Sequence, residues 1–465
     1  MRIFTFLALV ITTFSWAECS NGSNPARREY DNTLGRLIEE KFPNGKSLKI
    51  SYDEKNRVIQ LSIDDAGSIF YKYDDTHLLE ISRIAPNGER AYTHSYQYDF
   101  SDGLSSEELI SNLGQISYKK DPLERRMEIE SPYSQEIYQL SPKGLVITHT
   151  LDEKTVDYQY DDDNQVIADA NKTPNYSTEY DCNGRITKKI SPETRIYFEF
   201  DEDGRLIEAV SDQSTVTYSY DDFDRRTEKR VLKKGQEEIE TYLYFGNNEI
   251  AIYDGKGNLK QLRVPGLSFD NDVVLPVAIE INEVVFAPLH DYKGNISKLI
   301  DTKTKEVITL PIIDTFGENL AQVVSPTPWL FASKHYDAET NLVYFGSRYY
   351  DPEQKQWITP DPLGTLQHPN VYLYCLGNPL SYFDPDGKFA IPLINIAWGA
   401  GAILSFPAWG TAALVTAAGA AAGWATYEVI QKVKEGKQRD GTPRSNEAQN
   451  DQFEDAVREI ERKLG

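Results

Sequence analysis

Few side chains of this 465-residue chain could do chemistry, because histidine and cysteine are sparse. The three cysteines, Cys19, Cys182 and Cys375, have no zinc-type spacing and cannot form a disulfide framework. The six histidines all lie before position 369. His290 could serve as a base, but no nucleophile or second base stands at a recognisable spacing, so a turn position is the better interpretation. The remaining candidates for chemistry are the carboxylates. Two of them held together cannot both ionise readily, so one stays protonated while the other can activate water.

The elements that would position such groups follow a repeat of about twenty residues. An aromatic residue followed by Asp recurs along the chain, with Lys120-Asp121 and Leu140-Ser141 as degenerate copies. From position 120 to position 220 the copies are evenly spaced at 20 residues, and the earlier spacing is slightly looser. The regular pairs are Tyr30-Asp31, Tyr52-Asp53, Tyr73-Asp74, Tyr98-Asp99, Tyr160-Asp161, Tyr180-Asp181, Phe200-Asp201 and Tyr220-Asp221.

The sequence pattern of each repeat unit is typical of a β-hairpin. Phe198 and Phe200 alternate in an extended segment, and Asp201-Glu202-Asp203-Gly204 supplies turn chemistry before the return strand. Residues 30–230 are therefore expected to form antiparallel hairpins at about twenty-residue intervals. Residues 232–335 look less regular, although Asp254 and Asp291 begin segments that resemble diverged hairpin turns.

The acidic turns also raise the possibility of calcium binding. Asp161-Asp162-Asp163-Asn164 and the turn at Asp201 lack the Gly and terminal Glu that an EF-hand loop requires, so structural turns are favoured. The repeated tyrosines are favoured as packed strand residues over a ligand-stacking surface. No metal site and no cofactor are predicted.

The Tyr-Asp repeat resembles the YD repeat of RHS proteins, of the C components of insecticidal toxin complexes and of teneurins. The stretch after it is similar to the RHS repeat-associated core domain, and repeats and core together span residues 30–387. The segments that carry the core resemblance are Tyr336 to Leu342, Tyr344 to Pro352, Trp357 to Gly364, Asn370 to Tyr374, Gly377 to Leu380 and Asp384 to Gly387.

The resemblance implies a hollow β-shell, plugged by the core, that holds the sequence after the core as cargo. It also implies self-cleavage just after the second Asp-Pro-x-Gly, close to Lys388-Phe389, with Arg348, Asp361 and Asp384 as the residues of that step. A guanidinium near two carboxylates would hold the ionised one. The family usually has Leu where this chain has Lys388. The alternative is that the three residues pin the plug by hydrogen bonds and Asx turns.

The N-terminus predicts export. Arg2 is followed by an apolar run and then by Ser15-Trp16-Ala17, the pattern of a signal peptide over residues 1–17. The alternatives are an uncleaved anchor or a buried first strand. The net charge of -23 argues against nucleic-acid binding.

The C-terminal segment 388–465 changes composition abruptly. Residues 389–427 contain no charged side chain, and Gly419 and Gly423 form a G-x-x-x-G step that lets helices approach closely in lipid. Membrane contact through 389–427 is predicted, with a buried helical hairpin and a linker-like leader as alternatives. Residues 450–464 have the pattern of an amphipathic helix.

The prediction for the whole chain is an all-β protein, a spiralling antiparallel YD-repeat sheet closed by an RHS core, with a small α-helical tail. Its expected parts are a signal peptide (1–17), a YD-repeat β-shell (30–335), a core domain (336–387) and a variable tail (388–465). The expected function is an exported shell, of the toxin-delivery or intercellular-competition type, that shields and releases a short membrane-active tail. A structural or adhesive envelope protein, anchored by its apolar segment, is the alternative. At most one enzymatic activity is predicted, an aspartic-type self-cleavage after the RHS core, and no turnover enzyme. A second shell-forming chain or a secretion apparatus would be the partner, and the location secreted or in the cell envelope.

Overall fold

Alternating strands fold this chain into antiparallel sheets. The computed structural model describes residues 26–392, except for 101–102, 122, 124, 168–175, 193 and 270–272. Two 13-stranded sheets, β1–β13 and β14–β26, each run as a simple meander in which every strand pairs with its neighbours in sequence. A four-stranded sheet, β27–β30, and a two-stranded sheet, β31–β32, follow. The predicted all-β class with antiparallel hairpins is confirmed.

The bounds of the strands are as follows. The first sheet contains β1 Arg27–Tyr30, β2 Leu37–Lys41, β3 Ser47–Tyr52, β4 Val58–Ile63, β5 Gly67–Tyr73, β6 Leu78–Ile84, β7 Arg90–Tyr98, β8 Leu104–Glu108, β9 Gln115–Asp121, β10 Arg126–Ser131, β11 Ser134–Leu140, β12 Val146–Leu151 and β13 Lys154–Asp157. The second contains β14 Ser177–Tyr180, β15 Ile186–Ile190, β16 Arg195–Phe200, β17 Leu206–Ser211, β18 Ser214–Tyr220, β19 Arg226–Lys233, β20 Gln236–Phe245, β21 Asn248–Asp254, β22 Leu259–Phe269, β23 Val273–Ile281, β24 Val284–His290, β25 Ile296–Asp301 and β26 Val307–Thr309. The short strands are β27 His335–Asp337, β28 Leu342–Tyr344, β29 Tyr349–Asp351, β30 Gln356–Trp357, β31 Tyr382–Phe383 and β32 Ile391–Pro392, with short 3-10 turns at Ile110–Asn112, Leu320–Gln322, Phe331–Ser333 and Tyr374–Gly377.

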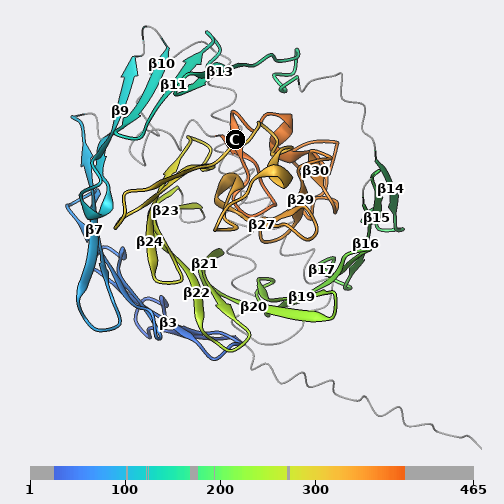
Figure 1. Ribbon diagram of the computed structural model, residues 1–465, viewed down its shortest axis with the longest axis horizontal. Helices are drawn as coiled ribbons and strands as arrows, with labels where there is room; N and C mark the ends of the chain where they lie inside the picture. Colours follow the sequence, from blue (N-terminus) through green and yellow to red (C-terminus); the bar gives the residue numbers. More distant parts are fainter. Residues whose placement is uncertain are drawn as a thin grey trace, which may run out of the picture.

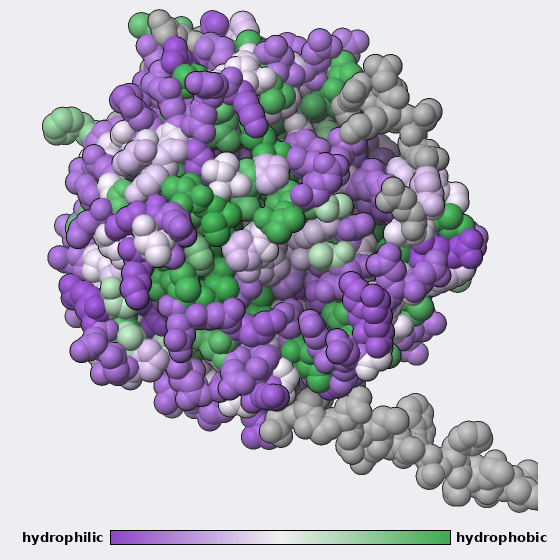
Figure 2. All heavy atoms as spheres, in the orientation of Figure 1, coloured by the Kyte–Doolittle hydropathy of each residue, from purple (hydrophilic) through white to green (hydrophobic). Residues whose placement is uncertain are grey.

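The two large sheets surround the segment that carries β27–β32. In Figure 1 the first sheet and the early strands of the second form an outer arc, and the segment from β27 onward, coloured orange to red, lies inside it. Strands β21–β24 lie between the first sheet and this central segment. In Figure 2 hydrophilic side chains dominate the rim of the same face, and hydrophobic ones gather towards its middle. The central segment is therefore held by sheet on several sides.

The Asp of each regular repeat organises its hairpin turn. Asp201 Oδ1 accepts the backbone N–H of Arg205 at 2.8 Å, and its Oδ2 accepts Arg205 Nε at 2.7 Å. Asp181 and Arg185 repeat both contacts, and Arg185 Nη1 also donates to the carbonyl of Asp201 in the next turn at 2.8 Å. Each such arginine therefore closes its own turn, and Arg185 in addition links its turn to the next one.

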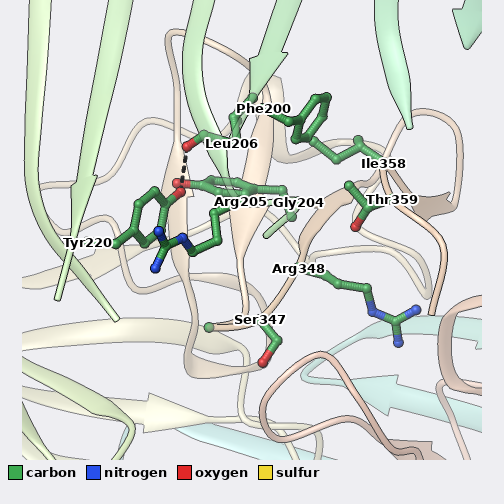
Figure 3. A pocket seen from close by; sticks show the side chains of 11 residues that line it. Phe200, Gly204, Arg205, Leu206, Tyr220, Ser347, Arg348, Ile358 and Thr359 are labelled. Carbon is green, nitrogen blue, oxygen red and sulfur yellow. Dashed lines mark hydrogen bonds between the residues drawn. The ribbon is translucent and has the colours of Figure 1, made fainter. Parts of the chain in front are cut away.

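The tyrosine of each pair links neighbouring hairpins in a second way. Tyr220 Oη donates to the carbonyl of Leu206 at 2.6 Å, and the guanidinium of Arg205 lies over the Tyr220 ring with its carbon 5.3 Å from the centroid (Figure 3). Tyr73 makes the corresponding hydrogen bond to Val58 at 3.0 Å. The register shifts at the aromatic residue, as at Tyr220, which is the mark of a bulge before the turn. Tyr and Asp thus recur together because the Asp side chain closes each turn and the Tyr hydroxyl ties that hairpin to its neighbour.

Residues 232–300 are more regular than the sequence suggests. Strands β20–β25 continue the meander, and their inner positions are among the most buried in the protein. The Asp254 and Asp291 turns keep the same geometry, but Asn replaces the arginine: Asn258 Nδ2 and Asn295 Nδ2 donate to the Asp side chains at 2.8 and 2.7 Å. The diverged hairpin turns expected at Asp254 and Asp291 are present, and the strands around them continue the meander of the earlier repeats. His290 ends β24, and burial lowers its pKa to about 4, so it is neutral at physiological pH.

Buried ion pairs fix the layers against one another. Arg83 on β6 donates through Nε to Glu280 on β23 at 2.8 Å, which joins the two large sheets. Arg225, after β18, donates to Glu40 on β2 at 2.6 Å and to its own turn residue Asp221 at 2.7 Å. Because Arg83 and Glu280 lie far apart in sequence, as do Arg225 and Glu40, these two contacts hold the sheets in one relative position.

The central segment is anchored by a charge network around Asp337 on β27. Arg226 Nη1 donates to Asp337 Oδ2 at 2.7 Å, and Lys229 Nζ donates to Oδ1 at 3.0 Å. The side chains of Arg226 and Asp337 are both 0% exposed. Burial alone raises the pKa of Asp337, but the two cations outweigh it and hold the pKa well below its usual range. At neutral pH the anchor is therefore fully charged.

Two predictions from the sequence concern residues outside the described ranges. The predicted signal peptide, 1–17, is one, and the tail from position 393 onward, which includes nearly all of 389–427, is the other. In the part of the chain that the structure describes, no helix is both long and apolar enough to cross a membrane. The predicted domain boundaries remain predictions.

Candidate active site

The three residues singled out from the resemblance come together in the central segment. Arg348 lies in the tight turn between β28 and β29, and Asp361 begins the turn after β30. Asp384 begins the loop between β31 and β32. One nitrogen of Arg348, Nη2, lies 3.0 Å from Asp361 Oδ2 and 3.6 Å from Asp384 Oδ2. A single guanidinium is therefore shared by the two carboxylates.

The position of Arg348 is fixed by its surroundings. Its side chain is 3% exposed, and its guanidinium carbon lies 4.2 Å from the centroid of the Trp357 ring. Nη1 donates to the carbonyl of Val371 at 3.3 Å. On the outer side, a small pocket separates the Arg348 turn from the hairpins around Arg205 and Tyr220, and the Arg348 guanidinium extends away from them (Figure 3). Stacking, burial and hydrogen bonds leave this side chain little freedom.

The loop after β31 places one peptide bond between Arg348 and Asp384. Arg348 Nε donates to the carbonyl oxygen of Gly387. Asp384 Oδ1 accepts the N–H of Gly387 at 2.7 Å and that of Lys388 at 3.1 Å. The Gly387–Lys388 bond thus has its oxygen on a cation and its nitrogen on a carboxyl group. This is the bond directly after the second Asp-Pro-x-Gly.

Glycine is required at position 387 by its backbone and by the close approach of Arg348. Its φ is +78°, a value that side chains with a Cβ rarely adopt. A Cβ there would lie 3.1 Å from the backbone nitrogen of Arg348 and 3.3 Å from Phe345 Cβ. Any larger residue would push the Gly387 carbonyl off the Arg348 guanidinium.

The environments of the two aspartates differ. Asp384 is 2% exposed, and burial raises its pKa to about 6, with Arg348 opposing the rise and the nearby Asp386 adding to it. Asp361 is more open, at 14% exposure; burial raises its pKa too, against the opposing charge of Arg348. The pair is therefore suited to divide acid and base roles, with Asp384 the stronger holder of a proton.

A pocket opens beside the carboxylates. It is small, with room for about one water molecule, and its lining includes Arg348, Asp361 and Asp384 together with Gln367, His368 and Cys375. Water can therefore approach the face of the site on which both carboxylates lie.

Two features of the site were missed from the sequence. Asp386, the variable residue of the second Asp-Pro-x-Gly, is a third buried carboxylate. Its acidic identity between Pro385 and Gly387 was a readable signal. Trp357, the ring under Arg348, could have been found only from the fold, because nothing in its local sequence links it to that arginine.

Comparison with known proteins agrees with this architecture. The family described as "Teneurin YD-shell" matches residues 68–372. A crystal structure of TcdB2-TccC3 without the hypervariable C-terminal region superposes with a TM-score of 0.51 at 16% identity, over 78% of this chain and 25% of that one. The same complex in a second crystal structure, TcdB2-TccC3-TEV, gives a TM-score of 0.52 at 15% identity, with the same shares covered. At such identities the likeness is one of fold.

Curated relatives match shorter or more distant stretches. Toxin subunit YenC2 of Yersinia entomophaga is 44% identical over 66 residues, which are 14% of this chain and 7% of that protein. Toxin protein Tse5 of Pseudomonas aeruginosa is 41% identical over 69 residues, 15% of this chain and 5% of that one. The tRNA3(Ser)-specific nuclease WapA of Bacillus spizizenii is 24% identical over 404 residues, 84% of this chain and 17% of that one. The chain spans less than a fifth of the length of each.

These matches define the class of protein. The chain is a YD-repeat shell protein with an RHS-type core, as its sequence indicated. It belongs to the teneurin YD-shell family.

Proposed function

We propose that this chain is an exported shell protein that shields its own C-terminal tail and releases it by cutting the chain once, at the Gly387–Lys388 bond. The observation that carries the proposal is the placement of this bond, with Arg348 Nε on the Gly387 oxygen and Asp384 Oδ1 on the Lys388 nitrogen. The site acts on a segment already bound within the core, so one cut per molecule is expected.

The residues would divide the hydrolysis as follows. Asp361, ionised beside Arg348, takes a proton from a water in the adjoining pocket, and the water oxygen bonds to the Gly387 carbonyl carbon. Arg348 Nε stabilises the negative charge that develops on the carbonyl oxygen. Asp384, protonated, gives its proton to the Lys388 nitrogen as the carbon–nitrogen bond breaks. The products are the Gly387 carboxyl group and the Lys388 amine.

The environment of Asp384 suits the role of acid. Its pKa of about 6 leaves a fraction protonated at neutral pH, and its Oδ1 is already within hydrogen-bond distance of the leaving nitrogen. Holding the reacting bond in this position removes the entropy of bringing it there, which in oriented systems is worth about 7–11 kcal/mol of the barrier.

Cleavage should respond to pH in a predictable direction. The active form needs Asp384 protonated and Asp361 ionised, so the rate should fall about tenfold per pH unit above about 6. It should also fall at acidic pH, where Asp361 takes up a proton. Pulse-labelled cell-free synthesis of the full chain, sampled at a series of pH values, measures this profile. A rate that keeps rising from pH 6 to pH 8 would contradict the assignment of Asp384 as the acid. Samples must be compared with an Asp361→Asn chain, because Asp-Pro bonds break in acid without catalysis.

The fate of the tail separates delivery from anchoring. The uncharged segment 389–427 supports a role for the tail at a membrane, and toxin names among the relatives support delivery. In fractionated cells, the proposal expects the tail fragment to separate from the shell fragment when released, and deletion of 389–427 to abolish membrane association of any fragment. Full-length chain that stays in the membrane fraction would favour the anchored envelope protein instead.

The comparison structures suggest the kind of partner. Both contain TcdB2 together with TccC3. We infer that a second shell-forming chain completes the enclosure around the central segment of this one, and that a secretion apparatus or such a chain carries it from the cell.

A further inference from the structure

Asp386 is a buried carboxylate with one ion-pair partner among the described residues. It is 2% exposed, and among the described residues neither of its side-chain oxygens accepts a hydrogen bond. Its ion-pair partner is Lys388, whose Nζ lies 3.2 Å from Asp386 Oδ2. A buried carboxylate without a partner is strongly unfavourable, so this lysine is the group that makes an acid tolerable here.

The pair bridges the bond that the proposed reaction breaks. Asp386 precedes Gly387 and Lys388 follows it, so the ion pair closes a small loop that contains the Gly387–Lys388 bond. The backbone of Asp386 is held as well, since its carbonyl accepts the N–H of Ser347 at 2.9 Å. The peptide oxygen of Gly387 is thereby kept facing Arg348.

Arg348 is surrounded by more negative charge than it can satisfy alone. Asp361 and Asp384 both contact its Nη2, and Asp386 also acts on it electrostatically. If Asp386 lost Lys388, the charge of Arg348, which already acts on Asp386, would be left to compensate it. The guanidinium would then be drawn away from Asp361 and from the Gly387 oxygen.

We propose that Lys388 and Asp386 are a positioning pair for self-cleavage: Lys388 neutralises Asp386, so that Arg348 stays on Asp361 and on the carbonyl of the bond to be cut. This inference rests on the proposed function. It gives Lys388, the residue at which this chain departs from the usual Leu, a supporting role in the reaction instead of a blocking one.

The pair can be tested with a cycle of three variants. Lys388→Met removes the positive charge and keeps most of the side-chain length. Asp386→Asn removes the negative charge that the lysine compensates, and the double variant removes both charges. Pulse-labelled cell-free synthesis of each full-length chain, followed by gel analysis over time, gives the cleavage rate. We expect Lys388→Met to be cut about tenfold more slowly than wild type. A tenfold change lies in the middle of the range of interaction free energies between residues in direct contact. The double variant should recover most of the rate, and Lys388→Arg should be cut nearly as fast as wild type.

The pH profile distinguishes positioning from a general structural effect. Lys388→Met should shift the alkaline limb of the profile to higher pH, because an uncompensated Asp386 makes Asp384 harder to ionise. The charged and titratable groups that act on Asp384 are Arg348, Asp361, Asp386, Tyr374 and Cys375, and Lys388 pairs with Asp386 beside it. Lys355→Met is the matched control: Lys355 pairs with Glu318 at 2.9 Å in the same central segment with similar exposure, and its loss should leave both rate and profile unchanged.

The outcomes separate the two proposals. If wild type and Lys388→Met are cut at the same rate and with the same pH profile, the positioning pair is overturned. The proposed function is then unaffected. Faster cleavage of Lys388→Met than of wild type would show that the lysine hinders the reaction, which also overturns it. A wild-type chain that is never cut, with every variant equally intact, overturns the proposed function and this inference together.

Discussion

Asp361→Asn should leave the chain uncut. The amide keeps the shape of the side chain and can still accept the Leu363 N–H that Asp361 Oδ1 accepts at 2.8 Å, but it cannot take a proton from water. Loss of a general base lowers rates by about a hundredfold to ten-thousandfold, so no tail fragment should be detected over the time in which wild type is fully cut. Gel analysis of protein purified and held near neutral pH measures this.

The matched control for this substitution is Asp201→Asn. Asp201 begins a turn of the same kind and also pairs with an arginine, but that arginine, Arg205, belongs to the same turn, in a hairpin of the second sheet. The Asp201→Asn chain should be cut like wild type. If Asp361→Asn is cut at the wild-type rate while it remains folded, Asp361 has no part in the reaction and serves only its turn.

Asp337→Asn should have the largest effect on stability. It leaves Arg226 and Lys229 buried without their shared carboxylate, and breaking a buried pair from one side costs about 3–5 kcal/mol. Urea unfolding at neutral pH should show this loss in the free energy of unfolding. Asp203→Asn, at a side chain that is 75% exposed, should change the same quantity by less than about 0.5 kcal/mol.

The same residue predicts the response to acid. Because the pKa of Asp337 is lower in the folded chain than in the unfolded one, the stability it contributes is fully present above the unfolded value of about 3.9 and is lost as pH falls below it. Wild type should therefore lose stability steeply below about pH 4, whereas Asp337→Asn should lose less over the same range. Equal acid sensitivity of the two proteins would show that Asp337 does not carry this charge-dependent stability.

The repeats could be predicted because their turns depend on contacts between residues close in sequence. Contacts between residues far apart in sequence could not be predicted. An Asp that caps its own turn acts within five residues, so the Tyr-Asp pairs could be interpreted directly as hairpins. The arginine four residues after each Asp was visible, but its bridge from Arg185 to the next turn emerged only with the strands in register. Strands β20–β25 were underestimated because Asn258 and Asn295 replace that arginine, although the apolar alternation continues through them.

The candidate site likewise has residues that could be predicted from the sequence and contacts that could not. Arg348, Asp361 and Asp384 were found through resemblance to a family, and no rule of spacing would have placed three residues from separate turns around one guanidinium. The anchor at Asp337 joins residues 111 positions apart and carries no local signature. Asp386 was readable in the sequence, but its meaning depended on its burial and on the approach of Lys388, which only packing decides.

The most direct test of the account is the intact mass of the full-length protein after synthesis and purification near neutral pH. Self-cleavage at the Gly387–Lys388 bond should give two fragments in equal amounts, a shell that ends at Gly387 and a tail that begins at Lys388. A single intact chain in correctly folded protein, or a cut at any other bond, would contradict it.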